Sequence, residues 1–177
     1  MPEPRTTLPL AEIAQRLERA GIPWAVFAGA AAAYGVTRPL TDVDILVPAA
    51  EWTRTAALFP EAQVKRRADG PVECLQLPGF DIVAGLRAMD LDAQMAERLM
   101  RHEITGVTVP VIPPEDNILL KAMLGRGPEV GKHDWEDIGA MMAHLLALDW
   151  AYLRWRADAC RPQQCVLEAL WRQVGKT

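Results

Sequence analysis

Two aspartates, Asp42 and Asp44, stand directly before an apolar run at residues 45–47. In an extended chain successive side chains point to opposite faces, so these two carboxylates share a face about 7 Å apart along the chain. Two carboxylates at the mouth of a buried strand repel each other unless a cation lies between them. Because hard divalent cations prefer oxygen ligands, the pair predicts a metal site. Aspartates that only cap or solvate a strand end are the alternative for an isolated Asp-x-Asp.

Three further residues could complete such a site. Gly29 lies between an apolar run and a small-residue segment, where exposed backbone amides let a phosphate approach, although a tight turn would also need glycine. Arg38 stands four residues before Asp42 and suits either a phosphate or a salt bridge to one of the aspartates. Asp81 begins another apolar run, and an acid there must be exposed or paired. A third carboxylate would complete a two-metal site that activates a hydroxyl.

The elements that position these residues follow from hydrophobic periodicity and from turn residues. Helices are predicted at residues 10–17, 29–34, 51–59 and 91–102, and strands at residues 24–27, 43–47, 64–67, 72–77, 80–84 and 105–112. After Pro113 and Pro114 the pattern becomes helical, with helices predicted at residues 114–124 and 132–146, from residue 149 onward, and at residues 162–174. We therefore expect an α/β (α+β) fold: a small mixed sheet flanked by helices in residues 1–112, and a C-terminal helical part, residues 113–177, packed on it.

Length and composition restrict the class of protein. A chain of 177 residues, half of them hydrophobic, fits one domain with or without a helical appendage. The net charge of -4 gives no general attraction to nucleic acid or to anionic membranes. Three cysteines without a Cys-x-x-Cys pair argue against a disulfide framework. With no signal-peptide pattern and no apolar run of about 20 residues, we expect a soluble cytoplasmic protein without a membrane partner.

Residues 38–44 read Arg-Pro-Leu-Thr-Asp-Val-Asp and follow a strand, a glycine-containing turn and a short helix. This pattern resembles the nucleotidyltransferase superfamily of DNA polymerase β type, and within it the small prokaryotic members related to aminoglycoside and toxin-antitoxin nucleotidyltransferases. The resemblance continues into the helical part, where residues 113–116, Lys121 and residues 132–138 are similar to the family's P-x-E-D, helix lysine and K-D-x-x-D-I segments.

The resemblance implies transfer of a nucleoside monophosphate from a nucleoside triphosphate to an acceptor hydroxyl, with two Mg²⁺ ions as cofactors. The residues it implies as metal-binding and catalytic are Asp42, Asp44 and Asp81. Those it implies for nucleotide binding are Gly29, Ala30, Arg38, Thr41 and Lys121, with Lys132 and Asp134 as candidates on the acceptor side. Ala30 departs from the family, whose turn usually has glycine or serine there, and leaves only a backbone amide for the phosphate.

Several alternatives remain open at this point. The chain could be a non-catalytic nucleotide-binding or partner-binding module of the same fold, or a toxin-antitoxin component whose acceptor is a protein or tRNA. The sequence leaves the acceptor (small molecule, protein or tRNA), the base preference and the oligomeric state undecided. Lys121 could be solvated, and Asp137 could only stabilise a helix N-terminus. For the tryptophans of the helical part we expect packing, with base stacking as the alternative: Trp135, Trp150, Trp155 and Trp171.

Overall fold

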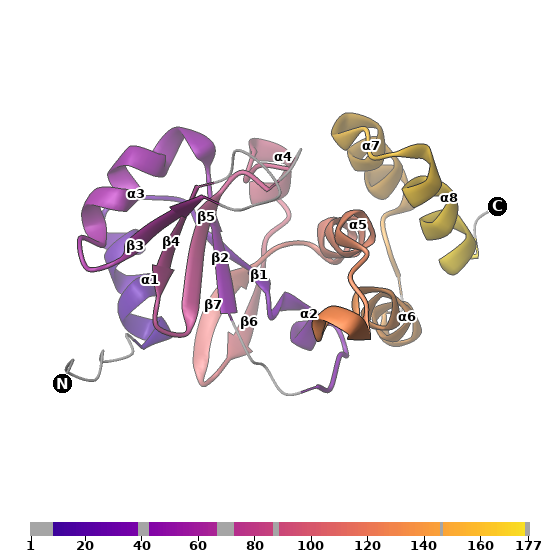
Figure 1. The fold of residues 1–177 in the computed structure, drawn as a ribbon, viewed down its shortest axis with the longest axis horizontal. Coiled ribbons are helices and arrows are strands. Elements are labelled where there is room, and N and C mark those ends of the chain that lie inside the picture. Colours follow the sequence, from indigo (N-terminus) through magenta and orange to yellow (C-terminus); the bar gives the residue numbers. More distant parts are fainter. Residues whose placement is uncertain (1–8, 39–42, 67–72, 87–88, 146, 176–177) are drawn as a thin grey trace. The chain divides into compact units, whose positions relative to one another are not determined.

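The described strands form one seven-stranded mixed sheet in the order β3-β4-β5-β2-β1-β7-β6 (Figure 1). The computed structural model describes residues 9–38, 43–66, 73–86, 89–145 and 147–175. The strands are β1 (Ala25–Ala28), β2 (Val43–Val47), β3 (Gln63–Arg66), β4 (Glu73–Leu77), β5 (Phe80–Ala84), β6 (Met100–Ile104) and β7 (Val107–Val111). β2 pairs with β5 and β1 with β7 in parallel, and the other neighbouring strands are antiparallel. The predicted α/β fold with a mixed sheet is confirmed.

The helices begin and end close to the predicted positions, with one exception described below. They are α1 (Leu10–Arg19), α2 (Ala30–Ala33), α3 (Trp52–Leu58), α4 (Ala93–Ala96), α5 (Pro114–Leu124), α6 (Asp134–His144), α7 (Trp150–Cys160) and α8 (Gln164–Gln173). Two single turns of 3-10 helix, Ala49–Glu51 and Pro128–Val130, precede α3 and follow α5. No helix in the described part of the chain has the length and apolarity needed to cross a membrane.

The chain divides into two compact units that alternate along the sequence. The first unit consists of residues 1–29 and 39–112, and the second of residues 30–38 and 113–177. In the first unit, α1 contacts both α3 and β7 and buries its apolar stripe of Leu10, Ile13 and Leu17. Gly21, with φ of +63°, lets the chain leave α1 in a conformation that other residues avoid. The predicted division at residue 112 stays a prediction.

In the second unit α5 is the central helix, in contact with α2, α6, α7 and α8 (Figure 1). Its sequence explains this position, because nearly every residue of α5, from Pro114 to Leu120 and again Ala122, is buried. A helix that is apolar on most sides is stable only when other helices surround it. Gly125, with φ of +56°, ends α5 as the sequence predicts.

The predicted helix at residues 91–102 is wrong. Only α4 forms there, with its first turn capped by the Asp92 carboxylate, and Met100–Ile104 is strand β6. β6 and β7 form a hairpin whose two loop residues, Thr105 and Gly106, have φ of +50° and +79°. A two-residue loop with positive φ at both positions matches the twist of the flanking strands. Pairing with β7 therefore outweighs the helix propensity of residues 97–102, and the predicted strand at 105–112 begins two residues later.

The tryptophans also depart from the prediction at one position. Trp135, Trp150 and Trp171 are partly buried, as expected for packing between helices. Trp155 on α7 is 46% exposed, so core packing is the wrong prediction for it. Its ring lies against the ring of Tyr152, with 5.8 Å between the centroids.

Candidate functional site

Two of the three predicted carboxylates lie side by side in the sheet. β2 and β5 pair in parallel with Asp44 directly opposite Asp81. Neighbouring strands are about 4.8 Å apart, and residues at paired positions point to the same face, so the two carboxylates are direct neighbours. The register is fixed by the buried residues around them, among them Ile45 and Ile82, since a slip of one residue would turn these apolar side chains to the other face.

The same row of the sheet continues on both sides of the carboxylate pair. Gln76 on β4 pairs with Asp81, and Ala28 on β1 pairs with Asp44. The Ala28 side chain adds no polar group beside Asp44, whereas Gln76 adds a neutral amide beside Asp81. Both aspartates are half-buried. Two half-buried carboxylates at paired positions repel each other, and a cation bound between them would offset that repulsion.

The two described carboxylates are suitable ligands for a hard divalent cation. Asp44 and Asp81 supply carboxylate oxygens, which are the ligands that Mg²⁺ prefers. Within the described residues, no cluster of three or more histidine, cysteine, aspartate or glutamate side chains could hold a metal. Asp42, the third predicted ligand, and Thr41 lie outside the described residues, and their roles stay predictions.

The end of β1 brings the predicted glycine turn next to this row. A bulge between Val26 and Ala28 shifts the register, and Gly29 follows at once with φ of +89°. A residue with a side chain would be strained there, which accounts for the glycine. Ala30 is buried and begins α2, a helix of only four residues. So short a helix has a weak dipole, so the predicted phosphate contact of this turn depends on its backbone amides.

In the second unit, Lys121 and Arg38 bind the same carboxylate, that of Asp137 on α6. Lys121 Nζ lies 2.7 Å from Asp137 Oδ2, and Arg38 Nη2 forms an ion pair with Asp137 Oδ1. Arg38 Nη1 also lies 3.4 Å from a carboxylate oxygen of Glu136. The Lys121 side chain is only 16% exposed, so it is not the solvated lysine of the simpler interpretation. Arg38 thus forms its described ion pairs with α6, and the salt bridge to Asp42 or Asp44 stays a prediction.

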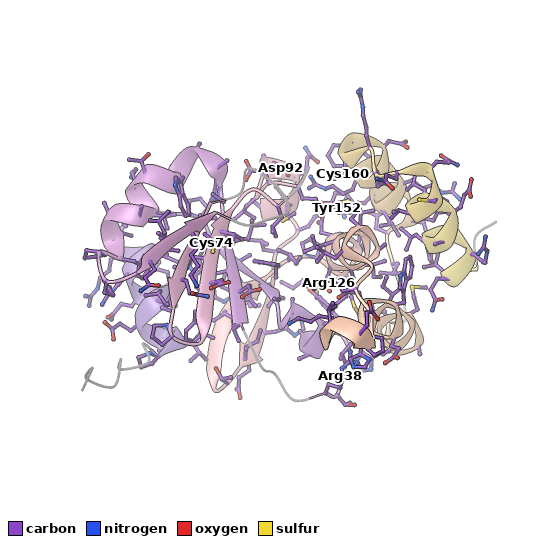
Figure 2. The ribbon with its side chains drawn as sticks, in the orientation of Figure 1. Arg38, Cys74, Asp92, Arg126, Tyr152 and Cys160 are labelled. Atoms are coloured by element: carbon purple, nitrogen blue, oxygen red, sulfur yellow. The ribbon has the colours of Figure 1, made fainter. Side chains whose placement is uncertain are left out.

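Asp134, the residue before Trp135 at the start of α6, closes the loop between α5 and α6. Its Oδ2 accepts hydrogen bonds from Arg126 N at 3.0 Å and Arg126 Nε at 2.9 Å, and its own N–H donates to Arg126 O at 3.0 Å. Arg126 and Arg38 both belong to the second unit (Figure 2). The Asp134 side chain is 1% exposed. Lys132, in the same loop, is half-buried, and the acceptor-side roles of both residues stay predictions.

Burial and charge act in opposite directions on the pKa values of this cluster. Burial by itself raises the pKa of Asp134, but the hydrogen bonds from Arg126 and the charge of Lys121 outweigh it and hold that pKa below its usual value. Burial lowers the pKa of Lys121, and the attraction to Asp134 only partly compensates. Each group also has a second partner, Asp137 for Lys121 and Arg126 for Asp134, so the loss of one partner would leave a buried charge only partly compensated.

The sequence matches no protein-family model and no curated protein. Solved structures share its architecture at low identity. The solution structure of the antibiotic-resistance factor ANT(2'')-Ia has a TM-score of 0.60 and 17% identity, over 90% of this chain and 93% of that one. The lincosamide antibiotic adenylyltransferase LnuA, in a lincomycin-bound crystal structure, has a TM-score of 0.52 and 13% identity, over 79% of this chain and all of that one. A Thermotoga maritima protein, provisionally assigned as a nucleotidyltransferase, has a TM-score of 0.50 and 20% identity over 68% and 85%.

The chain has the nucleotidyltransferase fold. At these identities the likeness concerns the fold alone, so the chemistry rests on the residues of this chain. Within the nucleotidyltransferase fold, the sheet positions Asp44 and Asp81, and the ends of α5 and α6 position Lys121 with its acidic partners.

The sequence did not predict a buried polar cluster that holds α7 on α5 in this fold. Arg156 Nε lies 2.8 Å from Asp116 Oδ1, the Tyr152 hydroxyl donates to Asp116 Oδ2 at 2.7 Å, and Arg156 Nη2 donates to the Tyr152 oxygen at 2.8 Å. Neither charged side chain is more than 3% exposed. Tyr152 lies on α7 (Figure 2), and its burial raises the pKa of its hydroxyl.

Glu115, the other acid of the P-x-E-D segment, caps α7 from outside, since its Oε1 accepts a hydrogen bond from Asp149 N at 2.7 Å. Both acids of this segment therefore stabilise the helical unit. A signal was present in the sequence, because two acids in the first turn of an otherwise apolar helix need partners once that helix is buried. Their partners, on α7 and at the residue that caps its N-terminus, could not be identified without the fold.

Proposed function

We propose that this protein is a nucleotidyltransferase that transfers a nucleoside monophosphate from a nucleoside triphosphate to a hydroxyl group. The observation that carries the proposal is the pair Asp44 and Asp81, opposite each other on β2 and β5. In the reaction, the acceptor oxygen attacks the α-phosphorus in line, a new phosphorus–oxygen bond forms, and the bond to the β-phosphate oxygen breaks. Pyrophosphate leaves and the hydroxyl proton is removed.

Asp42, Asp44 and Asp81 would hold two Mg²⁺ ions, which supply charge neutralisation of the phosphates and a lower pKa for the acceptor hydroxyl. Asp81 would orient that hydroxyl and accept its proton, since its carboxylate oxygens only accept hydrogen bonds when ionised. Arg38 and Lys121 keep their predicted role of neutralising the phosphates. The backbone amides of Gly29 and Ala30 keep their predicted role of donating hydrogen bonds to the phosphates.

A small hydroxyl-bearing molecule is the acceptor that we favour. The fold neighbours support this choice, because one is an antibiotic-resistance factor and another is an adenylyltransferase of lincosamide antibiotics with lincomycin bound. A protein or tRNA acceptor, as in a toxin-antitoxin pair, is the alternative that the sequence analysis left open.

A second candidate is a module with this fold that binds nucleotides without transferring them. Ala30 favours it, because alanine adds no hydroxyl to the turn after β1. The carboxylate pair argues for catalysis, since both acids would be unnecessary for holding a nucleotide base or ribose. Release of pyrophosphate distinguishes the two candidates.

The test is a calorimetric titration of the full chain with each nucleoside triphosphate, with Mg²⁺ and with a chelator. We expect Mg²⁺-dependent binding of the wild type and its loss in Asp44→Asn. Glu103→Gln is the matched control, because it removes the same charge at an exposed position of edge strand β6. Equal binding by wild type and Asp44→Asn would reject the metal assignment. Binding without pyrophosphate release across a panel of hydroxyl acceptors would favour the binding module.

A further inference from the structure

The carboxylate of Asp137 lies between the two cations that the proposed function assigns to phosphates. Each of its oxygens has a different partner: Oδ1 pairs with Arg38 Nη2 and Oδ2 with Lys121 Nζ. The carboxylate is 11% exposed, whereas the Arg38 side chain is 39% exposed. A bridging carboxylate at this position neutralises both cations and keeps them close together.

Asp134 contacts Lys121 too, but its geometry differs. It accepts a backbone N–H and a side-chain N–H from Arg126, and the backbones of these two residues are also hydrogen-bonded. Lys121 Nζ is 3.4 Å from Asp134 Oδ1, compared with 2.7 Å from Asp137 Oδ2. Asp134 is therefore part of the loop structure, whereas in the described part of the chain the partners of the Asp137 carboxylate are two side-chain cations.

Three cations of this cluster are already paired with acids, and His133 Nδ1 also lies 2.8 Å from a carboxylate oxygen of Glu136. Arg38, Lys121 and Arg126 face three acids of the first turn of α6, which are Asp134, Glu136 and Asp137. Acids are favourable at that position because they oppose the positive end of the helix dipole. An incoming phosphate thus meets cations whose charge is already compensated. It gains from them only by taking the place of a carboxylate.

We propose that Asp137 is an internal counter-ion that occupies Arg38 and Lys121 and competes with the triphosphate for them. The inference rests on the proposed function for the identity of the ligand. A triphosphate offers several anionic oxygens to the same donors, and such charge-assisted hydrogen bonds are stronger than neutral ones. Asp137 then sets how tightly the phosphates are held and supplies a counter-ion to both cations after they leave.

A purely structural role for Asp137 predicts the opposite result. If the carboxylate only orients Lys121 and Arg38, its removal disorders them and weakens phosphate binding. If it competes, its removal leaves two uncompensated cations and strengthens phosphate binding. The direction of the change in affinity therefore separates competition from orientation.

The test is calorimetry with inorganic tripolyphosphate, without Mg²⁺, on the full chain and on matched variants. We expect Asp137→Asn to bind it about fivefold tighter or more, with a steeper dependence on salt. Asp137→Glu restores the charge and returns the affinity toward the wild-type value. Asp158→Asn is the matched control: it makes the same exchange at an exposed position of α7 that takes no part in this cluster, so its affinity stays near that of the wild type.

A double variant completes the design. In Asp137→Asn combined with Lys121→Met the gain should disappear, because one of the two released cations is absent. Circular dichroism of each variant before and during heating confirms that it is folded. A lower or unchanged affinity of folded Asp137→Asn, a gain that survives the loss of Lys121, or no binding by either the wild type or Asp137→Asn would overturn the proposal.

The test of the Asp137 proposal can succeed or fail independently of the test of the proposed function. If Mg²⁺-dependent nucleotide binding fails in the wild type while Asp137→Asn binds tripolyphosphate more tightly, the counter-ion proposal is supported and the transferase proposal is rejected. If the wild type transfers nucleotides and Asp137→Asn binds like the wild type, only the counter-ion is rejected.

Discussion

The carboxylates of Asp44 and Asp81, which the proposed function requires, lower the stability of the folded protein. Like charges directly opposite each other in a sheet are destabilising, by amounts comparable to the 0.2–1 kcal/mol that favourable pairs contribute, i.e. roughly half a kcal/mol here. Residues that lower stability in this way are typical of functional sites. The pair is therefore expected to be more stable with a cation than without one.

We predict that Asp81→Asn raises the stability of the metal-free protein by about 0.5 kcal/mol, because the repulsion with Asp44 is removed. The same variant should lose the stabilisation that added Mg²⁺ gives the wild type. The measurement is thermal unfolding with Mg²⁺ and with a chelator. Glu103→Gln, an exposed neutralisation on β6, should keep the wild-type response. A metal-free Asp81→Asn that is clearly less stable than the wild type would show that the carboxylate has a structural partner.

Asp134 makes stability depend on acid pH. Although burial raises its pKa, hydrogen bonds from Arg126 outweigh this, so the folded pKa lies below the ordinary value of 3.8. Its contribution to stability is complete above 3.8 and is lost as the pH falls through the folded pKa. We predict that Asp134→Asn is less stable than the wild type near neutral pH and that the difference shrinks on acidification. Urea unfolding over this pH range measures it, and a difference that is constant with pH would contradict the assignment.

For single residues, the sequence allowed predictions only where the spacing along the chain determines how side chains are placed. Alternation of side chains in a strand drew attention to Asp42 and Asp44, and an acid at the start of an apolar run to Asp81, whereas their metal-binding role was implied by the family resemblance and stays a prediction. The sequence did not predict that Asp137 would pair with Arg38, or that Asp116 would pair with Arg156. Both ion pairs join residues far apart in the chain, and only the tertiary fold determines which cation meets which acid.

The β6–β7 hairpin shows where elements could not be predicted from propensity. Residues 97–102 have the composition of a helix, and the turn signal after them is weak because threonine, a β-branched residue, occupies the first loop position. The helix α4 stops at Ala96 and the chain enters the edge strand β6 instead. Helices and strands with strong periodicity, such as α1 and β2, were predicted because their pattern and their burial agree.

Thr105 carries the strain of this hairpin. Its φ of +50° is a left-handed conformation, which costs an ordinary residue about 1–2 kcal/mol and costs asparagine less. We predict that Thr105→Asn stabilises the protein by about 0.5–1 kcal/mol, since the Asn-Gly pair favours this turn. Chemical denaturation measures the gain. The control is Thr108→Asn in strand β7, also exposed, where the same exchange should lower stability because asparagine is a poor strand former. A loss of stability in Thr105→Asn would show that the threonine side chain has a role of its own.

At the scale of the whole molecule, the two units differ in charge. Counted over the sequence, the first unit has 10 Lys and Arg against 14 Asp and Glu, whereas the second has 9 of each. The entire net charge of -4 therefore belongs to the unit that carries the carboxylate pair. A triphosphate would be repelled by that unit unless cations accompany it, which is a further reason to expect binding to require Mg²⁺.

The two units are not two consecutive parts of the chain. Residues 30–38 lie in the first half of the sequence but belong to the helical unit. The sequence placed a boundary at residue 112, where the periodicity changes. Local pattern could not show that α2 contacts α5, that Tyr34 is 1% exposed, or that the His144 side chain lies close against Gly35. These contacts predict that residues 113–177 are incomplete by themselves.

We therefore predict that a fragment of residues 113–177 is helical but unfolds in a broad transition. Losing Tyr34 and the buried alanines of α2 exposes apolar surface on α5, and one large buried side chain is worth about 1.5–3 kcal/mol. Fusing residues 30–38 to the fragment through a flexible linker should restore a sharp transition, and the same fusion with Tyr34→Ala should not. The measurement is circular dichroism during heating, together with binding of a hydrophobic dye. If the fragment alone unfolds as sharply as the fusion, residues 113–177 are a domain in their own right, and the boundary at residue 112 is the correct one.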